Sequence, residues 1–118
     1  MSESVYPVVS PELAKRRREW GGPMFSAFRD WSRQVFAEGA LPVKTKQLIA
    51  LAVAHVTQCP YCIESHTKQA LAHGATREEI MEAIWVATEM RAGAAYAHSA
   101  VAIKVLHEAE QQQQAPAS

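Results

Sequence analysis

The sequence predicts an all-α fold, a bundle of about six helices in a single domain. Runs in which β-branched and aromatic residues alternate with polar ones, the pattern typical of strands, are absent. Segments with helical start and stop signals follow one another almost throughout the chain. The length of 118 residues fits one domain, and we place its core at about residues 24–110, followed by a polar tail at 111–118.

Three helices are expected in the first half of the chain. Ser10-Pro11-Glu12 supplies an N-cap, a first-turn proline and an acidic first turn for a helix that ends near Trp20. The second helix runs until Gly39 can serve as its C′ residue, and its apolar residues recur at three- and four-residue steps: Phe25, Phe28, Trp31, Val35 and Phe36. A third helix, at about residues 44–57, is apolar around nearly its whole circumference, so we expect it to be buried.

The second half of the chain carries clear helix caps. Pro60 can occupy the first position of a fourth helix, with Cys59 as its N-cap and Gly74 as its C′ stop. Thr76-Arg77-Glu78-Glu79 has the spacing of a capping box and opens a fifth helix, which we expect Gly93 to end or kink. Residues 94–110 then predict a last, alanine-rich helix.

Charge and hydropathy exclude two classes of partner. Twelve basic and twelve acidic residues give a formal net charge of +0, so no global field draws the protein to nucleic acid or to an anionic membrane. The longest strongly apolar stretch has nine residues, at 48–56, whereas a membrane span needs about 20. No secretory signal is visible at the start of the chain. We therefore expect a cytoplasmic protein.

Self-association is expected from the amount of apolar surface. A chain this small, with one helix apolar all round and another rich in small residues, has more apolar surface than one protomer hides. We therefore predict a symmetric homo-oligomer.

The residues that carry chemistry lie in the segment Cys59-Pro60-Tyr61-Cys62-Ile63-Glu64-Ser65-His66. If Pro60 starts a helix, Cys59 and Cys62 lie in its first turn, where unpaired N–H groups and the helix dipole lower the pKa of a thiol. At about 100° per residue, His66 points from roughly the same face as both cysteines. The arrangement predicts a reversible Cys59–Cys62 disulfide, with His66 able to accept or hold a thiol proton.

Three other interpretations of the cysteine pair were weighed. The pair can be structural or incidental. Zinc would need four ligands from one helix, namely Cys59, Cys62, His66 and His73, whereas structural zinc sites usually draw ligand pairs from two separated segments. Attachment of haem c requires a histidine directly after the second cysteine, where Ile63 stands. We therefore expect neither a metal nor a cofactor.

These residues resemble a known family. Leu41-Pro42 before the apolar helix, the Cys59–His66 segment and Gly74-Ala75-Thr76-Arg77-Glu78-Glu79-Ile80 are similar to the carboxymuconolactone decarboxylase family, in particular to its alkyl hydroperoxidase D-like branch. The similarity spans about residues 41–105. It implies an all-helical fold assembled as trimers or hexamers. It also implies a thiol-dependent peroxidase that reduces a hydroperoxide and is re-reduced by a dithiol, such as a lipoyl protein or a thioredoxin-like protein.

The resemblance also implies roles for the site residues. Cys62 would be the peroxidatic and more reactive thiol, Cys59 the resolving thiol and His66 the proton relay. Two positions depart from the pattern: Gln47 stands where the family has a glutamate, and Tyr61 where it has a histidine. Because glutamine cannot carry a proton, we expect Gln47 to weaken peroxidase turnover. The other candidates for the relay are Tyr61, Glu64, Glu89 and His98.

Two alternatives remain open at this point. The first is a lactone-decarboxylating lyase of the same fold, which would not need the cysteine pair. The second is a non-catalytic, redox-responsive oligomer or binding module, which the missing glutamate favours.

Overall fold

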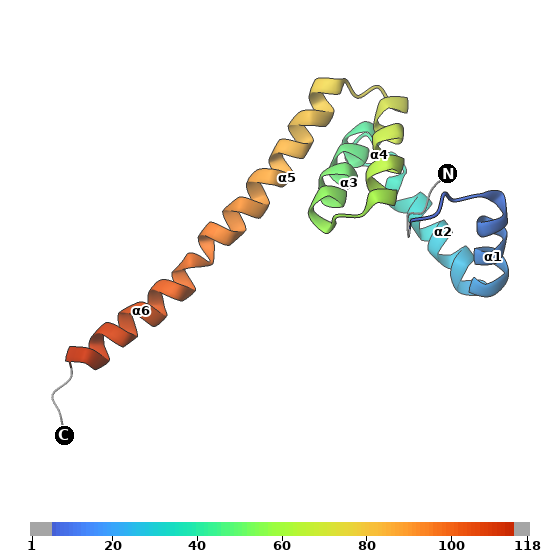
Figure 1. The fold of residues 1–118 in the computed structure, drawn as a ribbon. Coiled ribbons are helices and arrows are strands. Elements are labelled where there is room, and N and C mark those ends of the chain that lie inside the picture. The colour runs from blue at the N-terminus through green and yellow to red at the C-terminus, as the bar shows by residue number, and fades with distance from the viewer. Residues whose placement is uncertain (1–5, 115–118) are drawn as a thin grey trace. The chain divides into compact units, whose positions relative to one another are not determined.

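A computed structural model describes residues 6–114 and confirms the all-α fold, with no strand among these residues. The chain divides between Ala40 and Leu41 into two compact units, each of which is described by itself. Six helices make up the described residues (Figure 1): α1 (Pro11–Gly21), α2 (Pro23–Phe36), α3 (Val43–Thr57), α4 (Pro60–Ala72), α5 (Arg77–Ala97) and α6 (Ser99–Gln114).

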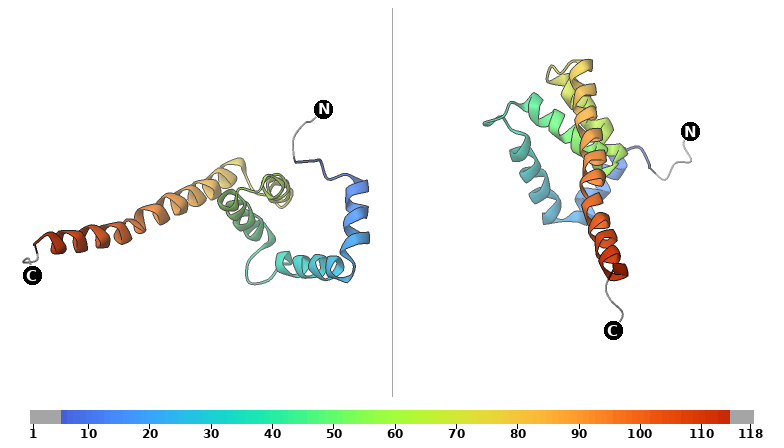
Figure 2. Two further views of the ribbon diagram at one scale, coloured as in Figure 1. Left: turned by 60° about the horizontal axis from the view of Figure 1, so that its bottom comes forward. Right: turned by 90° about the vertical axis from the view of Figure 1, so that its left-hand side faces the viewer.

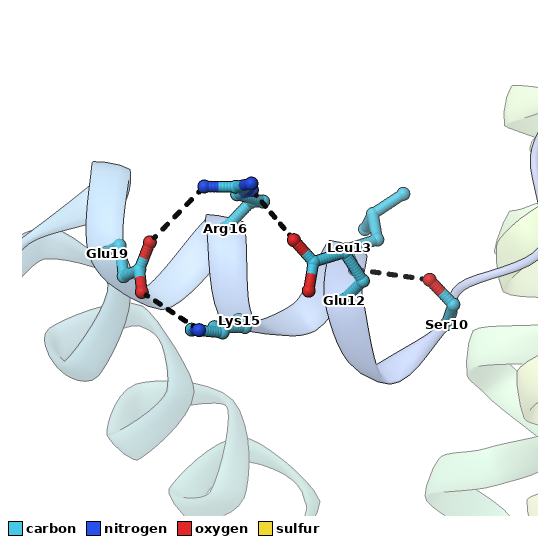
Figure 3. A network of polar contacts seen from close by, with 6 residues as sticks. All are labelled: Ser10, Glu12, Leu13, Lys15, Arg16 and Glu19. Atoms are coloured by element: carbon cyan, nitrogen blue, oxygen red, sulfur yellow. Dashed lines mark hydrogen bonds and ion pairs between the residues drawn. The ribbon is translucent and has the colours of Figure 1, made fainter.

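The first unit consists of α1 and α2. The predicted N-cap of α1 is confirmed, because the Ser10 hydroxyl oxygen accepts the backbone N–H of Leu13 at 3.2 Å and Pro11 opens the helix. Figure 3 shows the exposed ion pairs that follow, in which Arg16 lies 3.0 Å from Glu12 and 3.8 Å from Glu19. Pairs of this spacing support an isolated helix by a few tenths of a kcal/mol, about 0.2–0.5 each.

The second helix ends earlier than expected. It stops at Phe36, and the chain leaves it through Ala37 in an extended conformation (φ −67°, ψ 153°). Gly39 is therefore not a C′ residue, and it is not among the glycines with positive φ. The helix needs no left-handed residue at this end because the extended Ala37 already turns the chain away from it.

The second unit is built around α3, α4 and the first half of α5. The helices α3 and α4 lie side by side and run in opposite directions, and α5 packs against α3 (Figure 1). Leu51, Ala70, Ala75 and Ile80 form the buried core of this unit, with Leu48 and Ile84 packed against it. This small core joins the middle of α3 and the end of α4 to the first turns of α5.

The caps of α4 and α5 are those the sequence predicts. Cys59 is the N-cap of α4 and Pro60 its first residue. After α4, Gly74 has a φ of 90°, a conformation that only glycine adopts without strain. At the start of α5, Thr76 and Glu79 exchange both hydrogen bonds of a capping box, at 3.0 and 2.8 Å.

The later part of the chain corrects two sequence expectations. Gly93 does not end α5, which continues to Ala97, and the last helix begins at Ser99 rather than at residue 94. A Cβ atom at Gly93 would lie 3.3 Å from Oε1 of Glu89, so this glycine leaves room for a carboxylate one turn earlier. The last helix also includes residues 111–114 of the expected polar tail; residues 115–118 lie outside the described part.

Much of the apolar surface of the second unit is exposed. On α3 only Gln47, Leu51 and Ala54 are buried, and the expectation that the whole helix is buried is wrong for the single chain: Ile49 and Val53 are about half exposed. The last helix continues nearly in line with α5 (Figure 2) and, among the described residues, packs against neither α3 nor α4. No described helix is both long and apolar enough to cross a membrane.

Candidate functional site

The cysteine pair lies at the turn between α3 and α4. Gln58 ends α3 in the left-handed conformation (φ 59°, ψ 47°), and its backbone N–H donates to Ala54 O. The N–H of Cys59 donates to the same oxygen at 3.1 Å. The chain then continues into α4 with Cys59 extended (φ −101°, ψ 105°). This tight turn places the Cys59 side chain beneath the first N–H groups of α4.

The sulfur of Cys59 takes the place of a side-chain oxygen in the helix cap. The backbone N–H of Cys62 donates to Cys59 Sγ at 3.3 Å, a normal length for a bond to sulfur. The pKa of the Cys59 thiol is lowered, first because the Cys62 side chain donates to its sulfur and then because the N–H groups of Cys62 and Tyr61 do so. Hydrogen bonds to the charged form of a group favour that form. Cys59 is thus suited to carry the thiolate of the reduced pair.

The second thiol behaves in the opposite way. The pKa of Cys62 is raised, chiefly because its side chain is hydrogen-bonded to Cys59 and also because it is partly buried and lies near the Cys59 charge. The expectation of a lowered pKa in this turn therefore holds for Cys59 and is wrong for Cys62. The physical reason is that the N-cap position, where the free N–H groups converge, belongs to Cys59.

His66 lies on α4 and is held from α3. Its Nδ1 atom is 2.7 Å from Oε1 of Gln47, which is 5% exposed. Because an amide oxygen only accepts, Nδ1 donates, and the neutral ring then carries its lone pair on Nε2. Burial lowers the pKa of His66 and so favours this neutral form. Gln47 thus selects the tautomer in which Nε2 can act as a base.

The other relay candidates are scattered over the second unit. Tyr61 is close to the pair, and its backbone N–H contributes to the cap of Cys59. Glu64 is exposed and pairs with Lys68 at 2.9 Å. Glu89 lies on α5 with its carboxylate over Gly93. His98 ends α5, where its Nδ1 bonds to Ala94 O at 2.7 Å. The structure thus pairs Cys59 with Cys62 and His66 with Gln47, and places Glu64 and His98 in other local contacts.

Arg91 is a residue near the site that we did not predict. Its Nη1 atom donates to the backbone oxygen of Val56 at 2.5 Å, three residues before Cys59. His73, the fourth zinc ligand considered above, lies at the end of α4 and bonds to Gln69 O. Among the described residues, no three His, Cys, Asp or Glu side chains converge in a way that could hold a metal ion.

The arrangement can carry out thiol chemistry. It offers one thiol whose thiolate is stabilised by helix N–H groups, a second thiol one turn away, and a neutral imidazole oriented by a buried amide. The structure records both cysteines as free thiols.

Comparison with known proteins finds similar sequences over most of the chain. The sequence model of the carboxymuconolactone decarboxylase family matches residues 23–104. A protein of Paracoccus denitrificans named "Uncharacterized protein 4 in cox locus" is 57% identical over 108 residues, which are 92% of this chain and 96% of that protein.

Solved structures of the same family are similar in fold. The apo form of a carboxymuconolactone decarboxylase family protein from Legionella pneumophila has a TM-score of 0.63 and 36% sequence identity, over 82% of this chain and 86% of that one. A family member from Thermotoga maritima, described with a possible involvement in an antioxidative response, has a TM-score of 0.58 and 30% identity, over 80% of this chain and 97% of that one.

Proposed function

The chain belongs to the carboxymuconolactone decarboxylase family, and from this premise we propose that it is a thiol-dependent peroxidase that reduces hydroperoxides with Cys59 and Cys62. The observation that carries the proposal is the cap of α4, in which the sulfur of Cys59 accepts a hydrogen bond from a backbone N–H group of the helix. His66 lies one turn beyond Cys62 on the same helix. A stabilised thiolate beside a second thiol is what peroxide reduction through a reversible disulfide requires. The antioxidative description of the Thermotoga maritima relative agrees with this chemistry.

The reaction that we propose has two steps. The Cys59 thiolate attacks the distal oxygen of the hydroperoxide, the O–O bond breaks, and the sulfur becomes a sulfenic acid while the alkoxide leaves and takes up a proton. Cys62 then attacks the Cys59 sulfur, the S–S bond forms, and hydroxide leaves and is protonated to water. The pair loses two electrons to the peroxide, and a dithiol reductant restores both thiols by disulfide exchange.

The proton transfers of this reaction follow from the hydrogen bond between His66 and Gln47. In the first step the Nε2 atom of His66 can take the proton of the Cys62 thiol and pass it to the leaving alkoxide, and in the second step solvent supplies one proton to the hydroxide.

Family resemblance assigns the attack on peroxide to Cys62. The cap hydrogen bonds favour Cys59, and we adopt this order in the proposal.

Steady-state turnover tests the proposal. We expect the reduced protein to consume tert-butyl hydroperoxide with dihydrolipoamide as reductant, and we expect Cys59→Ser and Cys62→Ser each to abolish turnover, because disulfide closure needs both thiols. A parent rate no higher than that of the Cys59→Ser/Cys62→Ser double variant would refute the peroxidase and favour the redox-responsive module. Decarboxylation of a carboxymuconolactone that persists in the double variant would favour the lyase.

A further inference from the structure

An exposed arginine on α5 lies in line with the residues that pack against the core. Ile80, Ile84, Ala87 and Arg91 follow one another at steps of four, three and four residues, which places them on one side of the helix. Ile80 and Ala87 are buried, and Ile84 packs against the core. Arg91 continues this stripe towards the site, where its side chain is exposed to solvent. Its guanidinium group makes a hydrogen bond to another helix.

The partner in this hydrogen bond is the end of α3. Nη1 of Arg91 donates to Val56 O at 2.5 Å, across 35 residues of sequence. The last four carbonyl groups of a helix have no partner within it, and Val56 is one of the last residues of α3. A cation is also favoured at the negative end of the helix dipole. The contact therefore satisfies an unpaired carbonyl and fixes the end of α3 to α5.

The turn held in this way is the one that carries Cys59. Two residues separate Val56 from Cys59, and one of them, Gln58, has a φ of 59°, a left-handed conformation that a residue other than glycine keeps only when its surroundings hold it. The same turn brings the Cys59 N–H to Ala54 O at 3.1 Å and the Cys59 sulfur to the N–H of Cys62 at 3.3 Å. Movement of the end of α3 would disturb both bonds.

We propose that Arg91 is a positioning residue, which keeps the sulfur of Cys59 under the N–H groups of α4 by clamping the end of α3. Arg91 acts through the turn and not on the sulfur itself. The inference rests on the role of the cysteine pair in the proposed peroxidase, and it identifies the group that keeps the pair reactive. The ionisable and charged groups on the three helices around the turn are Lys44, Lys46 and His55 on α3, Tyr61, Cys62, Glu64, His66 and Lys68 on α4, and Arg77, Glu78, Glu79, Glu82, Glu89, Arg91 and Tyr96 on α5.

The pH dependence of Cys59 alkylation tests the proposal without peroxide or reductant. The full chain with Cys62→Ser has a single cysteine, and serine keeps a hydroxyl donor beside the Cys59 sulfur. In this background we expect Arg91→Met to move the iodoacetamide profile to higher pH. A rise of about half a pKa unit lowers the thiolate fraction roughly threefold at pH values below the pKa, so alkylation near neutral pH should slow by about that factor.

Two further variants make the result specific. Arg91→Lys keeps a cationic donor and should restore most of the parental profile. Arg77→Met removes an exposed arginine from the other end of α5 and should leave the profile unchanged. If Arg91→Met does not fold, as judged by circular dichroism, Arg91→Ala replaces it and carries the same expectation, because alanine also lacks a side-chain donor.

The outcomes separate this proposal from the proposed function. An unchanged alkylation profile for the folded Arg91 variant, or equal shifts for Arg91→Met and Arg77→Met, would overturn the proposal that Arg91 positions the Cys59 sulfur. A shifted profile in a protein that shows no peroxidase turnover would support the clamp and count against the peroxidase. An unshifted alkylation profile for the Arg91 variant, together with peroxidase turnover by the parent, would overturn the positioning role of Arg91 and support the peroxidase.

Discussion

At the scale of single residues, the chemistry of the site depends on which atom of each side chain already makes a hydrogen bond within the fold. The sulfur of Cys59 serves as the cap of α4, so N–H groups that the helix cannot otherwise satisfy would stabilise a negative charge on it. The Nδ1 atom of His66 is committed to Gln47, which leaves the chemistry of the ring to Nε2. Gln47 thus orients a base without itself being able to carry a proton.

The two thiols should differ in reactivity, and Cys59 should react faster. Cys62→Ser should retain rapid alkylation by iodoacetamide near neutral pH, whereas Cys59→Ser should lose it, because the pKa of Cys59 is lowered and that of Cys62 is raised. Peptide mapping of the partly alkylated parent protein gives an independent reading. Faster labelling of Cys62 would restore the order of attack that the family resemblance implies.

Replacement of Gln47 by glutamate should increase peroxidase turnover. A carboxylate 2.7 Å from Nδ1 would favour the charged imidazolium and raise the pKa of His66, which makes Nε2 a stronger base. The usual scale for a well-placed acid–base group suggests an increase of about tenfold or more. Turnover with tert-butyl hydroperoxide and dihydrolipoamide measures it.

The matched control for this substitution is Gln69→Glu, which adds the same charge at an exposed position of α4. Because Gln47 is buried, the melting temperature of Gln47→Glu must be recorded as well. Equal turnover for a folded Gln47→Glu and the parent would indicate that the relay runs through another group, with Glu89 the next to replace.

At the scale of helices, local signals were sufficient for the caps and insufficient for contacts between helices. Cys59 and Thr76 were predicted as N-caps because capping depends on a few neighbouring residues. The role of Gly93 was misjudged, since it depends on where the Glu89 carboxylate lies. Arg91 was missed, although a charge that continues the stripe of Ile80 and Ala87 is a signal that the sequence contains.

The contact between α3 and α4 should make stability depend on pH. Burial lowers the pKa of His66 below its ordinary 6.5, so the unfolded chain takes up a proton at a higher pH than the folded one. The free energy of unfolding should therefore decrease as the pH falls through 6.5 towards 5, and level off once the folded His66 is protonated as well. Urea unfolding at several pH values measures this slope.

His66→Gln should flatten the slope in this window, because glutamine does not titrate. Glu79 has its own effect at lower pH: Lys44, through a hydrogen bond at 2.8 Å, lowers the pKa of this carboxyl below its ordinary 4.5. The contribution of the ionised Glu79 carboxylate to the free energy of unfolding is lost only as the pH falls below about 4.5. The effects of His66 and Glu79 on stability therefore fall in different pH ranges. Identical slopes for the parent and His66→Gln between pH 7 and 5 would show that His66 titrates alike in both states.

At the scale of the whole molecule, the exposed apolar surface exceeds what a monomer usually leaves in water. In the second unit the core is limited to a few side chains, while many large ones on α5 and α6 are more than half exposed: Trp85, Val86, Met90, Val101, Ile103, Val105 and Leu106. Within this unit α6 packs only against α5. From this exposure we predict an interface with another chain.

We predict that the partners are further copies of this chain, which form a symmetric trimer or hexamer. Light scattering coupled to size exclusion should give a mass several times 13.0 kDa at micromolar concentration. Val101 and Val105 lie four residues apart on one face of α6, and both are about 60% exposed. Replacing both with lysine should dissociate the assembly, because two ammonium groups would have to leave water for the interface to form.

Gln112→Lys/Gln113→Lys is the matched control, since it adds the same two charges in the polar last turn of α6. This variant should keep the parental mass. Its α6 retains all of the apolar side chains named above, so only the position of the charges differs. A parent protein that elutes as a monodisperse monomer, or a lysine pair at 101 and 105 that leaves the mass unchanged, would show that this face of α6 does not hold copies of the chain together. The apolar side chains of α6 would then have to be covered by a different protein, which co-purification of the chain under native conditions would reveal.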